Sequence, residues 1–201
     1  MPERPVRKVA GKEDRRIQRT KQLVRAALLS LIEEKGFESL TVQDILDRAN
    51  LGRATFYAHF DNKQDLLLSG FDALRAILRE HQRQAHARRG GADDRLFAFT
   101  REIFDHVAGY RDVFRAMAGE QSGALIHHLM HKVIIDLVRE DVKAALARNE
   151  AVPAEAVVQF VAGGLFGLVR LWADGKLRLS ADEVNALFRG LALPAVKAVI
   201  R

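Results

Sequence analysis

Residues 41 to 63 decide the fold of this chain, and they read TVQDILDRANLGRATFYAHFDNK. Thr41 is suited to cap a helix, because Asp44 three residues later completes a capping box and apolar residues follow at helical spacing. The Asn-Leu-Gly sequence at residues 50 to 52 interrupts that helix, since Asn and Gly adopt left-handed backbone angles more readily than other residues. A second helix is expected over residues 53 to 60. The stretch therefore predicts two short helices joined by a tight turn.

The second of these helices has an apolar and a polar side. Its apolar residues Ala54, Phe56 and Phe60 can face inward, whereas side chains that form hydrogen bonds can point outward. The outward residues are Arg53, Thr55, Tyr57 and His59. A short helix that follows a tight turn and presents polar residues at its start is suited to the major groove of DNA. The local pattern thus predicts a helix-turn-helix.

The stretch also resembles the signature of the TetR family of bacterial one-component transcriptional regulators. The matching motifs are Thr-Val-x-x-Ile from Thr41, Thr-Phe-Tyr-x-His-Phe-x-Asn-Lys-x-Asp-Leu-Leu from Thr55, and Lys-Gly-Phe at residues 35 to 37. Two positions depart from the family pattern. Asn50 stands where Gly is usual, and Gly52 replaces a frequent Ser that can touch a DNA phosphate.

The resemblance, which covers roughly residues 16 to 70, implies which side chains contact DNA. Arg53 and Thr55 would meet base edges or nearby phosphates. The DNA backbone would be held by Tyr57, His59, Lys63, Thr41 and Gln43. The implied partner is a double-stranded, palindromic operator, and the implied function is that of a ligand-responsive repressor. A protein-binding coactivator or adaptor with the same fold but no operator of its own is the alternative.

Basic charge is concentrated near the N-terminus. Up to Arg25 the chain has nine Lys or Arg residues and three acids, which gives the same net charge of +6 as the whole chain. From Gly91 onward, 14 basic and 14 acidic residues cancel. Such clustering beside a helix-turn-helix is typical of a nucleic-acid partner. We expect residues 1 to 14 to be a basic arm that is disordered in the free protein; a solvated tail without a partner is the alternative.

The rest of the chain has helical periodicity, and no strand is indicated. Helices are expected near residues 17–36, 62–85, 93–108, 111–119, 122–149, 153–174 and 180–193. The fold class is therefore all-α. A three-helix DNA-binding domain at residues 15–60 is expected to connect, through a linking helix at residues 62–85, to a helical ligand-binding and dimerisation domain within residues 61–201.

Composition argues against several other classes of protein. There is no cysteine, and motifs for phosphate binding, nucleophilic catalysis or zinc hydrolysis are absent from the sequence, so we expect neither an enzyme nor a cofactor. No signal peptide or obvious membrane segment is apparent, which predicts a cytoplasmic protein without a membrane partner.

The last two expected helices are candidates for a homodimer interface. Residues 156 to 172 are apolar on all sides and include three glycines, which suggests close approach by another backbone. The resemblance implies a two-fold four-helix bundle, and the interface residues would be Phe160, Gly164, Leu168, Leu187 and Leu191. Burial inside a single chain is the alternative for these residues.

The middle helices are rich in aromatic residues that could line a pocket for a small apolar or aromatic effector. The candidates are Phe97, Phe104, Tyr110, Phe114, Met117, His128, Phe166 and Trp172. Ordinary core packing would produce the same pattern. His127 and His131 are one helical turn apart, as a pair of metal ligands would be, but a third ligand is not apparent and no metal site is expected.

Overall fold

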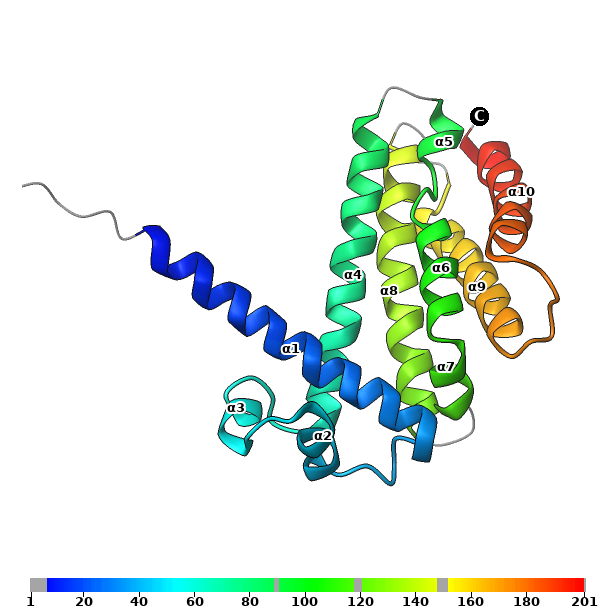
Figure 1. The fold of residues 1–201 in the computed structure, drawn as a ribbon. Helices are drawn as coiled ribbons and strands as arrows, with labels where there is room; N and C mark the ends of the chain where they lie inside the picture. Colours follow the sequence, from blue (N-terminus) through cyan, green and yellow to red (C-terminus); the bar gives the residue numbers. More distant parts are fainter. Residues whose placement is uncertain (1–6, 89–90, 118–120, 148–151, 201) are drawn as a thin grey trace, which may run out of the picture. The chain divides into compact units, whose positions relative to one another are not determined.

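The computed structural model describes residues 7–88, 91–117, 121–147 and 152–200 (Figure 1). Every regular element in these residues is a helix, which confirms the all-α prediction. The helices are α1 (Arg7–Lys35), α2 (Val42–Ala49), α3 (Arg53–Tyr57), α4 (Lys63–Ala87), α5 (Ala92–Arg95), α6 (Thr100–Gly109), α7 (Arg111–Met117), α8 (Gln121–Ala145), α9 (Ala154–Ala173) and α10 (Ala181–Ile200).

Several helix boundaries differ from the sequence predictions, and the helix expected over residues 93–108 is divided into α5 and α6 because Leu96 is extended and Phe97 has a left-handed φ. α1 begins at Arg7, so residues 7 to 14, which we expected to be disordered, are helical; residues 1 to 6 lie outside the described residues. The start of α1 is polar and shows no apolar period to reveal it. α3 ends at Tyr57, and α10 continues to Ile200 with Pro194 inside it. The helix end expected at residue 119 lies outside the described residues, whereas α8 ends at Ala145, earlier than the expected residue 149.

The chain divides into two compact units, residues 1–70 and 71–201, and α4 contributes to both. The sequence placed this boundary ten residues earlier, after residue 60. The first turns of α4 belong to unit 1 because Leu66 and Leu67 are buried in its core. Arg25 of α1 also donates to Ser69, from Nε to the hydroxyl at 3.1 Å and from Nη2 to the carbonyl at 3.0 Å.

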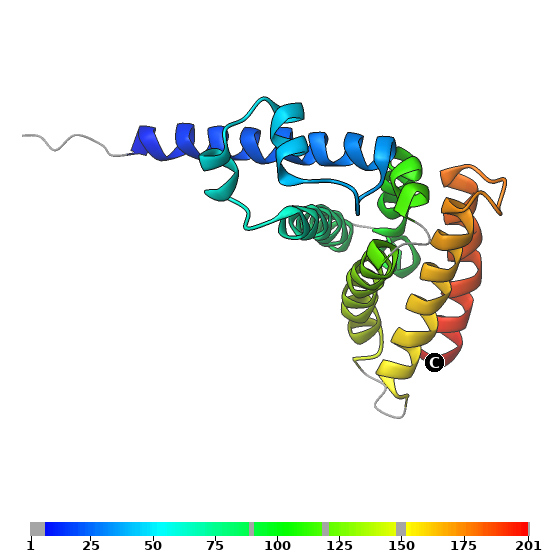
Figure 2. The same cartoon turned by 90° about the horizontal axis from the view of Figure 1, so that it is seen from below.

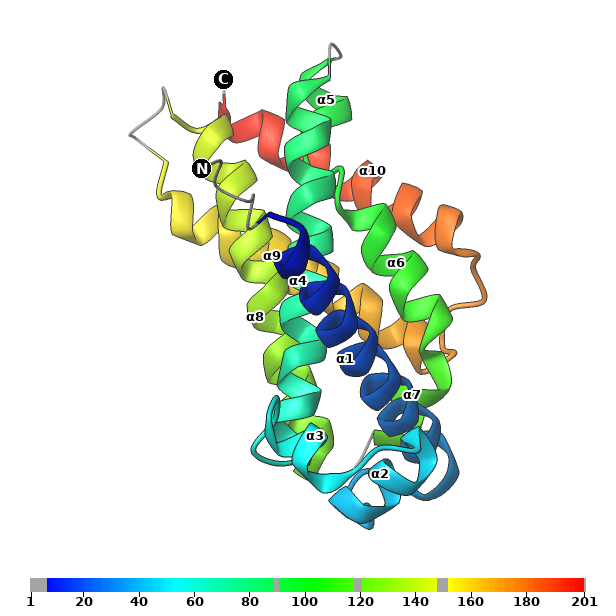
Figure 3. The same cartoon turned by 60° about the vertical axis from the view of Figure 1, so that its left-hand side comes forward.

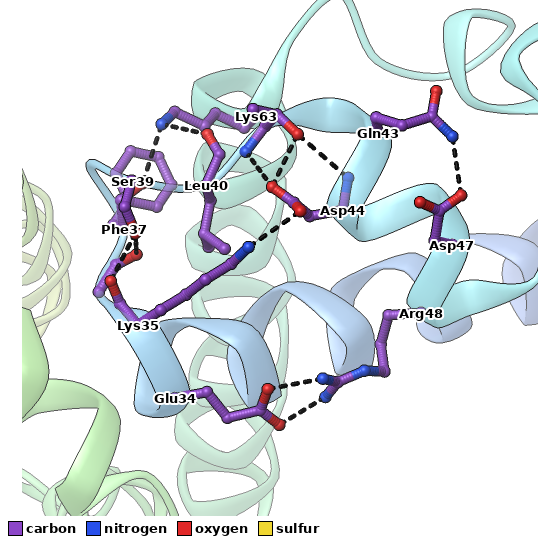
Figure 4. A network of polar contacts seen from close by, with 12 residues as sticks. Glu34, Lys35, Phe37, Ser39, Leu40, Gln43, Asp44, Asp47, Arg48 and Lys63 are labelled. Atoms are coloured by element: carbon purple, nitrogen blue, oxygen red, sulfur yellow. Dashed lines mark hydrogen bonds and ion pairs between the residues drawn. The ribbon is translucent and has the colours of Figure 1, made fainter.

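The core of unit 1 forms where α1 packs on α2. Its buried side chains are Val24, Leu28, Leu31, Ile32, Phe37, Ile45, Leu46, Phe56, Phe60 and Leu66. On the surface, Arg48 of α2 donates from both terminal nitrogens to the carboxylate of Glu34 on α1, at 2.7 and 2.6 Å (Figure 4). Apolar packing and this two-pronged ion pair therefore fix α2 against α1.

Unit 2 is built around α8 and α9, which pack side by side (Figure 2). α10 contacts both α9 and α6 (Figure 3). The core contains Phe97, Phe99, Phe104, Val133, Leu137, Leu165, Trp172 and Phe188, all buried. Trp172 is fixed in this core because its ring nitrogen donates to the carbonyl of Leu179 at 2.7 Å.

A buried carboxylate joins three parts of unit 2. Asp141 of α8 accepts hydrogen bonds from the Phe97 N–H at 2.7 Å and from the amide of Gln82, on α4, at 2.6 Å. His86 Nε2 lies 3.0 Å from the same carboxylate. Burial raises the pKa of Asp141, and these hydrogen bonds oppose that rise. Phe97 itself has a left-handed φ of 58°, so this network stabilises an unfavourable backbone conformation before α6.

α9 has the length and composition of a membrane-spanning helix, with a mean hydropathy of 1.6. This differs from our expectation that no such segment was present. One side of the helix is nevertheless part of the protein core, because Val158, Leu165 and Val169 are buried. We therefore interpret α9 as a core helix whose remaining apolar surface is uncovered.

Candidate nucleic-acid interface

α2 begins with the capping box expected at Thr41. The Thr41 N–H donates to the Asp44 carboxylate at 2.8 Å, and the Asp44 N–H donates to the Thr41 hydroxyl oxygen at 3.2 Å. Lys35 also lies 2.9 Å from this carboxylate (Figure 4). Hydrogen bonds from Thr41 and Lys35 hold the pKa of Asp44 well below its usual range. The Thr41 side chain therefore fixes the start of α2.

The turn between α2 and α3 follows the predicted backbone geometry. Asn50 adopts the left-handed region with φ 52° and ψ 51°, and its N–H donates to carbonyls of the last turn of α2. Gly52 then occupies the N-cap of α3 with an extended backbone and no side-chain hydrogen bond. Asn can replace the usual Gly at residue 50 because it tolerates left-handed angles.

α3 exposes Arg53 and Tyr57, as the sequence predicted, but it also exposes Ala54, which was expected to face inward. Phe56 is fully buried, whereas Arg53 is exposed and the ring of Tyr57 is 55% exposed. Thr55 and His59 are half-buried. Tyr57 packs its ring edge against Phe56 at a centroid distance of 5.4 Å, so the exposed ring is held by the core beneath it.

Arg53 is held by a residue of the preceding helix. Its Nε and Nη2 donate to the side-chain oxygen of Gln43 at 3.1 and 2.8 Å. The amide nitrogen of Gln43 donates to Asp47 at 2.7 Å. Two of the predicted DNA ligands are thus in contact with each other, and Asp47 is a contact that our sequence reading missed. The four-residue spacing of Gln43 and Asp47 along a helix is the signal that could have revealed it.

Lys63 has a different environment from the one that the resemblance implied. Its ammonium donates to the carbonyls of Phe37, Glu38 and Leu40 at 2.8, 3.0 and 2.7 Å (Figure 4). It also lies 4.8 Å from the centre of the Phe37 ring. An ammonium has three protons, and three carbonyls receive them here. In this arrangement Lys63 stabilises the segment that connects α1 to α2. A contact with a DNA phosphate would require its ammonium to leave these carbonyls.

Only some of the residues proposed to line an effector pocket are buried in the core of unit 2. Phe97, Phe104, Met117 and Trp172 are buried, Phe114 and Phe166 are half-buried, and Tyr110 is 36% exposed. Phe104 meets the Trp172 ring edge-on at 5.7 Å, and the guanidinium of Arg111 lies 4.4 Å above the centre of that ring. His128 is exposed, which contradicts its placement among pocket-lining residues.

The neighbouring histidines of α8 contact an aromatic side chain of α9. His127 and His131 both contact the ring of Phe166, at centroid distances of 6.0 and 4.9 Å. Among the residues that the structure describes, there is no group of three or more His, Cys, Asp or Glu side chains placed to hold a metal ion.

The proposed dimer residues lie on an uncovered apolar surface of α9 and α10. Phe160 is 68% exposed and Leu191 is 63% exposed. Leu187 and Gly164 are also exposed, and Leu168 is half-buried. Two shallow apolar grooves share Phe160; one is lined further by Gly164, Leu168, Phe188 and Leu191, and the other by Ala156, Val157, Val196 and Val199. Phe160, Gly164, Leu168 and Leu191 therefore line one groove, whereas Leu187 lines neither.

Comparison with known proteins matches both units. The family model described as bacterial regulatory proteins, tetR family, matches residues 24–69, and the model of a transcriptional regulator C-terminal region matches residues 94–193. The chain is 30% identical over 101 residues to an uncharacterized HTH-type transcriptional regulator of Haemophilus influenzae. This match covers 50% of the chain and 49% of that protein.

A second relative, the uncharacterized HTH-type regulator YxbF of Bacillus subtilis, is 42% identical over 55 residues, which are 27% of this chain and 14% of YxbF. The matches thus span about half or less of these curated relatives.

Solved structures share the fold at low identity. A TetR-family regulator from Syntrophomonas wolfei superposes with a TM-score of 0.75 at 14% identity, over 90% of this chain and 96% of that one. FadR from Bacillus subtilis, in complex with stearoyl-CoA, gives a TM-score of 0.64 at 16% identity, over 89% and 97%. These likenesses establish the fold, and the two matching family models describe transcriptional regulators rather than enzymes. Because two successive family models match this chain and its α2–turn–α3 has helix-turn-helix geometry, it belongs to the TetR family of bacterial transcriptional regulators.

Proposed function

We propose that this protein is a dimeric, DNA-binding repressor that binds a palindromic operator in the cytoplasm and is released by a small apolar effector. The main support is the side chains that α2 and α3 present outward. Arg53 and Tyr57 are exposed beside the half-buried Thr55, while Phe56 and Phe60 anchor the helix from below. A short helix carrying such residues suits insertion in the major groove.

Dimerisation would bring two such helices to one operator. A single α3 reaches only a few base pairs, whereas two related by a two-fold axis read both halves of a palindrome. The exposed apolar surface around Phe160 and Leu191 supports α9 and α10 as the interface, because uncovered large apolar side chains commonly mark a partner surface.

The proposed effector belongs to the class of apolar molecules. The apolar environment of Phe104, Phe114 and Trp172 supports an apolar molecule. Since the structurally similar FadR of Bacillus subtilis was solved with stearoyl-CoA, long-chain acyl-CoA, whose acyl tail is apolar, and the corresponding free fatty acid are suitable first probes. We expect an effector to weaken operator binding, which a titration against a labelled operator would detect.

The DNA-binding proposal is tested by selecting sites from random duplexes and measuring affinity by fluorescence anisotropy over a range of salt. We expect a palindrome to be selected and the affinity to fall steeply as salt rises. Arg53→Ala should lose roughly 1 to 3 kcal/mol of discrimination at one base pair in each half-site. Arg178→Ala, which removes an exposed arginine from unit 2, is the matched control. Failure to select any site would favour the adaptor alternative.

A further inference from the structure

Three side chains of α2 and α3 form a hydrogen-bonded chain that ends at the arginine proposed to read DNA. Asp47 accepts from Gln43, and Gln43 accepts from Arg53 through two nitrogens of its guanidinium. In Figure 4 the amide nitrogen of Gln43 points toward Asp47 and its oxygen points away. These hydrogen bonds therefore connect an acid of α2 to the first residue of α3.

The chemistry of these groups fixes the orientation of the Gln43 amide. A carboxylate only accepts hydrogen bonds, and a guanidinium only donates them. The nitrogen of Gln43 must therefore face Asp47, and its oxygen must face Arg53. Without an acceptor at residue 47, the amide would be free to turn and present its nitrogen, a donor, to the guanidinium. Asp47 thus determines whether Gln43 can hold Arg53.

Gln43 occupies one edge of the Arg53 guanidinium, the edge formed by Nε and Nη2. The opposite edge, formed by Nη1 and the second Nη2 proton, has no partner among the residues that the structure describes. That edge is a two-donor fork, which matches the O6 and N7 acceptors of guanine. The contact therefore restrains the arginine and leaves its reading edge open.

Local stability accounts for Asp47 only in part, because its hydrogen bond from Gln43 four residues earlier supports α2 while its charge opposes the helix dipole. The residue is exposed and lies in the last turn of α2, where the helix dipole disfavours an acid. A negative charge at this surface would also repel phosphates and weaken binding to any DNA. A charge that opposes the helix dipole and repels phosphates fits a residue whose hydrogen bond to Gln43 contributes to sequence choice.

We propose that Asp47 is a positioning residue for sequence recognition: it orients Gln43, which restrains Arg53 so that the open edge of its guanidinium meets a guanine. This inference rests on the proposed DNA-binding function. It predicts that removing the carboxylate lowers discrimination between sites while leaving affinity for unrelated DNA unchanged or higher.

The test compares Asp47→Ala with Asp47→Asn. Both variants remove the charge, but asparagine keeps an oxygen that can accept from Gln43. For each protein, Kd is measured by fluorescence anisotropy for the palindrome selected by the wild type and for a scrambled duplex of equal length. The discrimination ratio is the Kd for the scrambled duplex divided by the Kd for the palindrome. We expect Asp47→Ala to reduce this ratio about three- to tenfold, which is less than the loss of a full bidentate contact. Asp47→Asn should stay within about twofold of the wild-type ratio.

The double substitution Gln43→Ala with Asp47→Ala tests whether Asp47 acts on DNA recognition through Gln43 or independently of it. In a Gln43→Ala background, Asp47→Ala should not change the ratio further, because the carboxylate then has no amide to orient. Circular dichroism would confirm that each variant retains its helices.

Several outcomes would overturn the inference while the wild type still selects a site. Equal ratios for Asp47→Ala and the wild type would show that Asp47 orients nothing. Equal losses in the alanine and asparagine variants would assign the effect to charge. A higher ratio in Asp47→Ala would show that the contact withholds Arg53 from DNA. Failure of the wild type to select any site would instead refute the proposed function, and the inference with it.

Discussion

Lys63 illustrates how a residue at a DNA-binding position of its family can have a structural role. Its three contacts with the carbonyls of Phe37, Glu38 and Leu40 satisfy backbone acceptors between two helices. Lys63→Gln leaves these acceptors without the ammonium, so we expect unfolding free energy to fall by about 1 to 3 kcal/mol. Thermal and urea unfolding followed by circular dichroism would measure this loss.

The exposed Lys132, changed to Gln, provides a control that removes the same charge from unit 2. Hydrogen exchange should show faster exchange around residues 36 to 42 in Lys63→Gln alone. If stability were unchanged and the salt dependence of DNA binding dropped by about one phosphate contact, Lys63 would be a phosphate ligand instead.

From the burial of His106 we predict that unit 2 becomes less stable at acidic pH. Burial lowers the pKa of His106 to about 4, and its ring lies 4.6 Å from that of Tyr110. Because the folded pKa lies below the unfolded value of about 6.5, the stabilisation is present above pH 6.5 and is lost as pH falls toward 4. His106→Phe keeps an aromatic ring without a titrating group. Between pH 6.5 and pH 4, the free energy of unfolding of the wild type should fall by up to about 3 kcal/mol more than that of this variant.

Urea unfolding of both proteins at a series of pH values would provide the comparison, since the other titrating groups are common to both. Parallel pH profiles for the wild type and His106→Phe would contradict the prediction.

At the scale of single elements, the start of α3 combines an open space with a favourable backbone. Gly52 is an N-cap with φ −78°, and an added Cβ would have no heavy atom within 4 Å. Gly52→Ser therefore introduces a capping hydroxyl without strain, which should stabilise α3 by a few tenths of a kcal/mol. We also expect tighter DNA binding, because the resemblance implies a phosphate contact for Ser here. Gly52→Ala is the matched control without the hydroxyl.

Thermal unfolding and anisotropy on the same three proteins would separate the two effects. Equal DNA affinity of the Ser and Ala variants would show that residue 52 does not reach a phosphate.

Helix starts marked by local hydrogen bonds were predictable from sequence. The capping boxes of α2 and α10 depend on residues three apart, Thr41 with Asp44 and Ser180 with Glu183, and both are present in the structure. The start of α1 was not predictable in this way, because its polar first turns give no periodic signal. The continuation of α10 beyond residue 193 was also missed, and Pro194, a residue that usually disfavours a helix interior, lies within it.

At the scale of the whole molecule, the apolar surface of α9 and α10 predicts the oligomeric state. Leu191→Asp places a charge in the centre of the proposed interface. We expect this variant to be a monomer of 22.5 kDa by light scattering, whereas the wild type has twice that mass. Its affinity for a palindrome should fall to that for a single half-site. Ile77→Asp, at another 49% exposed apolar residue, is the control.

A wild type that is monomeric at micromolar concentration, or a Leu191→Asp variant that remains dimeric, would contradict this assignment. Circular dichroism would confirm that both aspartate variants are folded.

The candidate sites differ in how far the sequence could define them. The exposure of Arg53 and Tyr57 followed from one helical period, but the same period wrongly placed the exposed Ala54 on the inward face of the short α3. The pocket residues come from several helices, and their burial depends on packing that a single sequence does not encode locally. His128 shows this clearly: it is exposed, whereas His127 and His131, on an adjacent side of the same helix, contact Phe166.

Trp172 is the only tryptophan of the chain, and its position makes it a natural optical probe. Its ring is buried between Phe104 and the guanidinium of Arg111, so emission should be shifted to the blue relative to the free amino acid. Tryptophan fluorescence therefore reports on unit 2 alone. A ligand that displaced Arg111 from the ring would change the emission directly, and compounds could be screened without a label or a known operator.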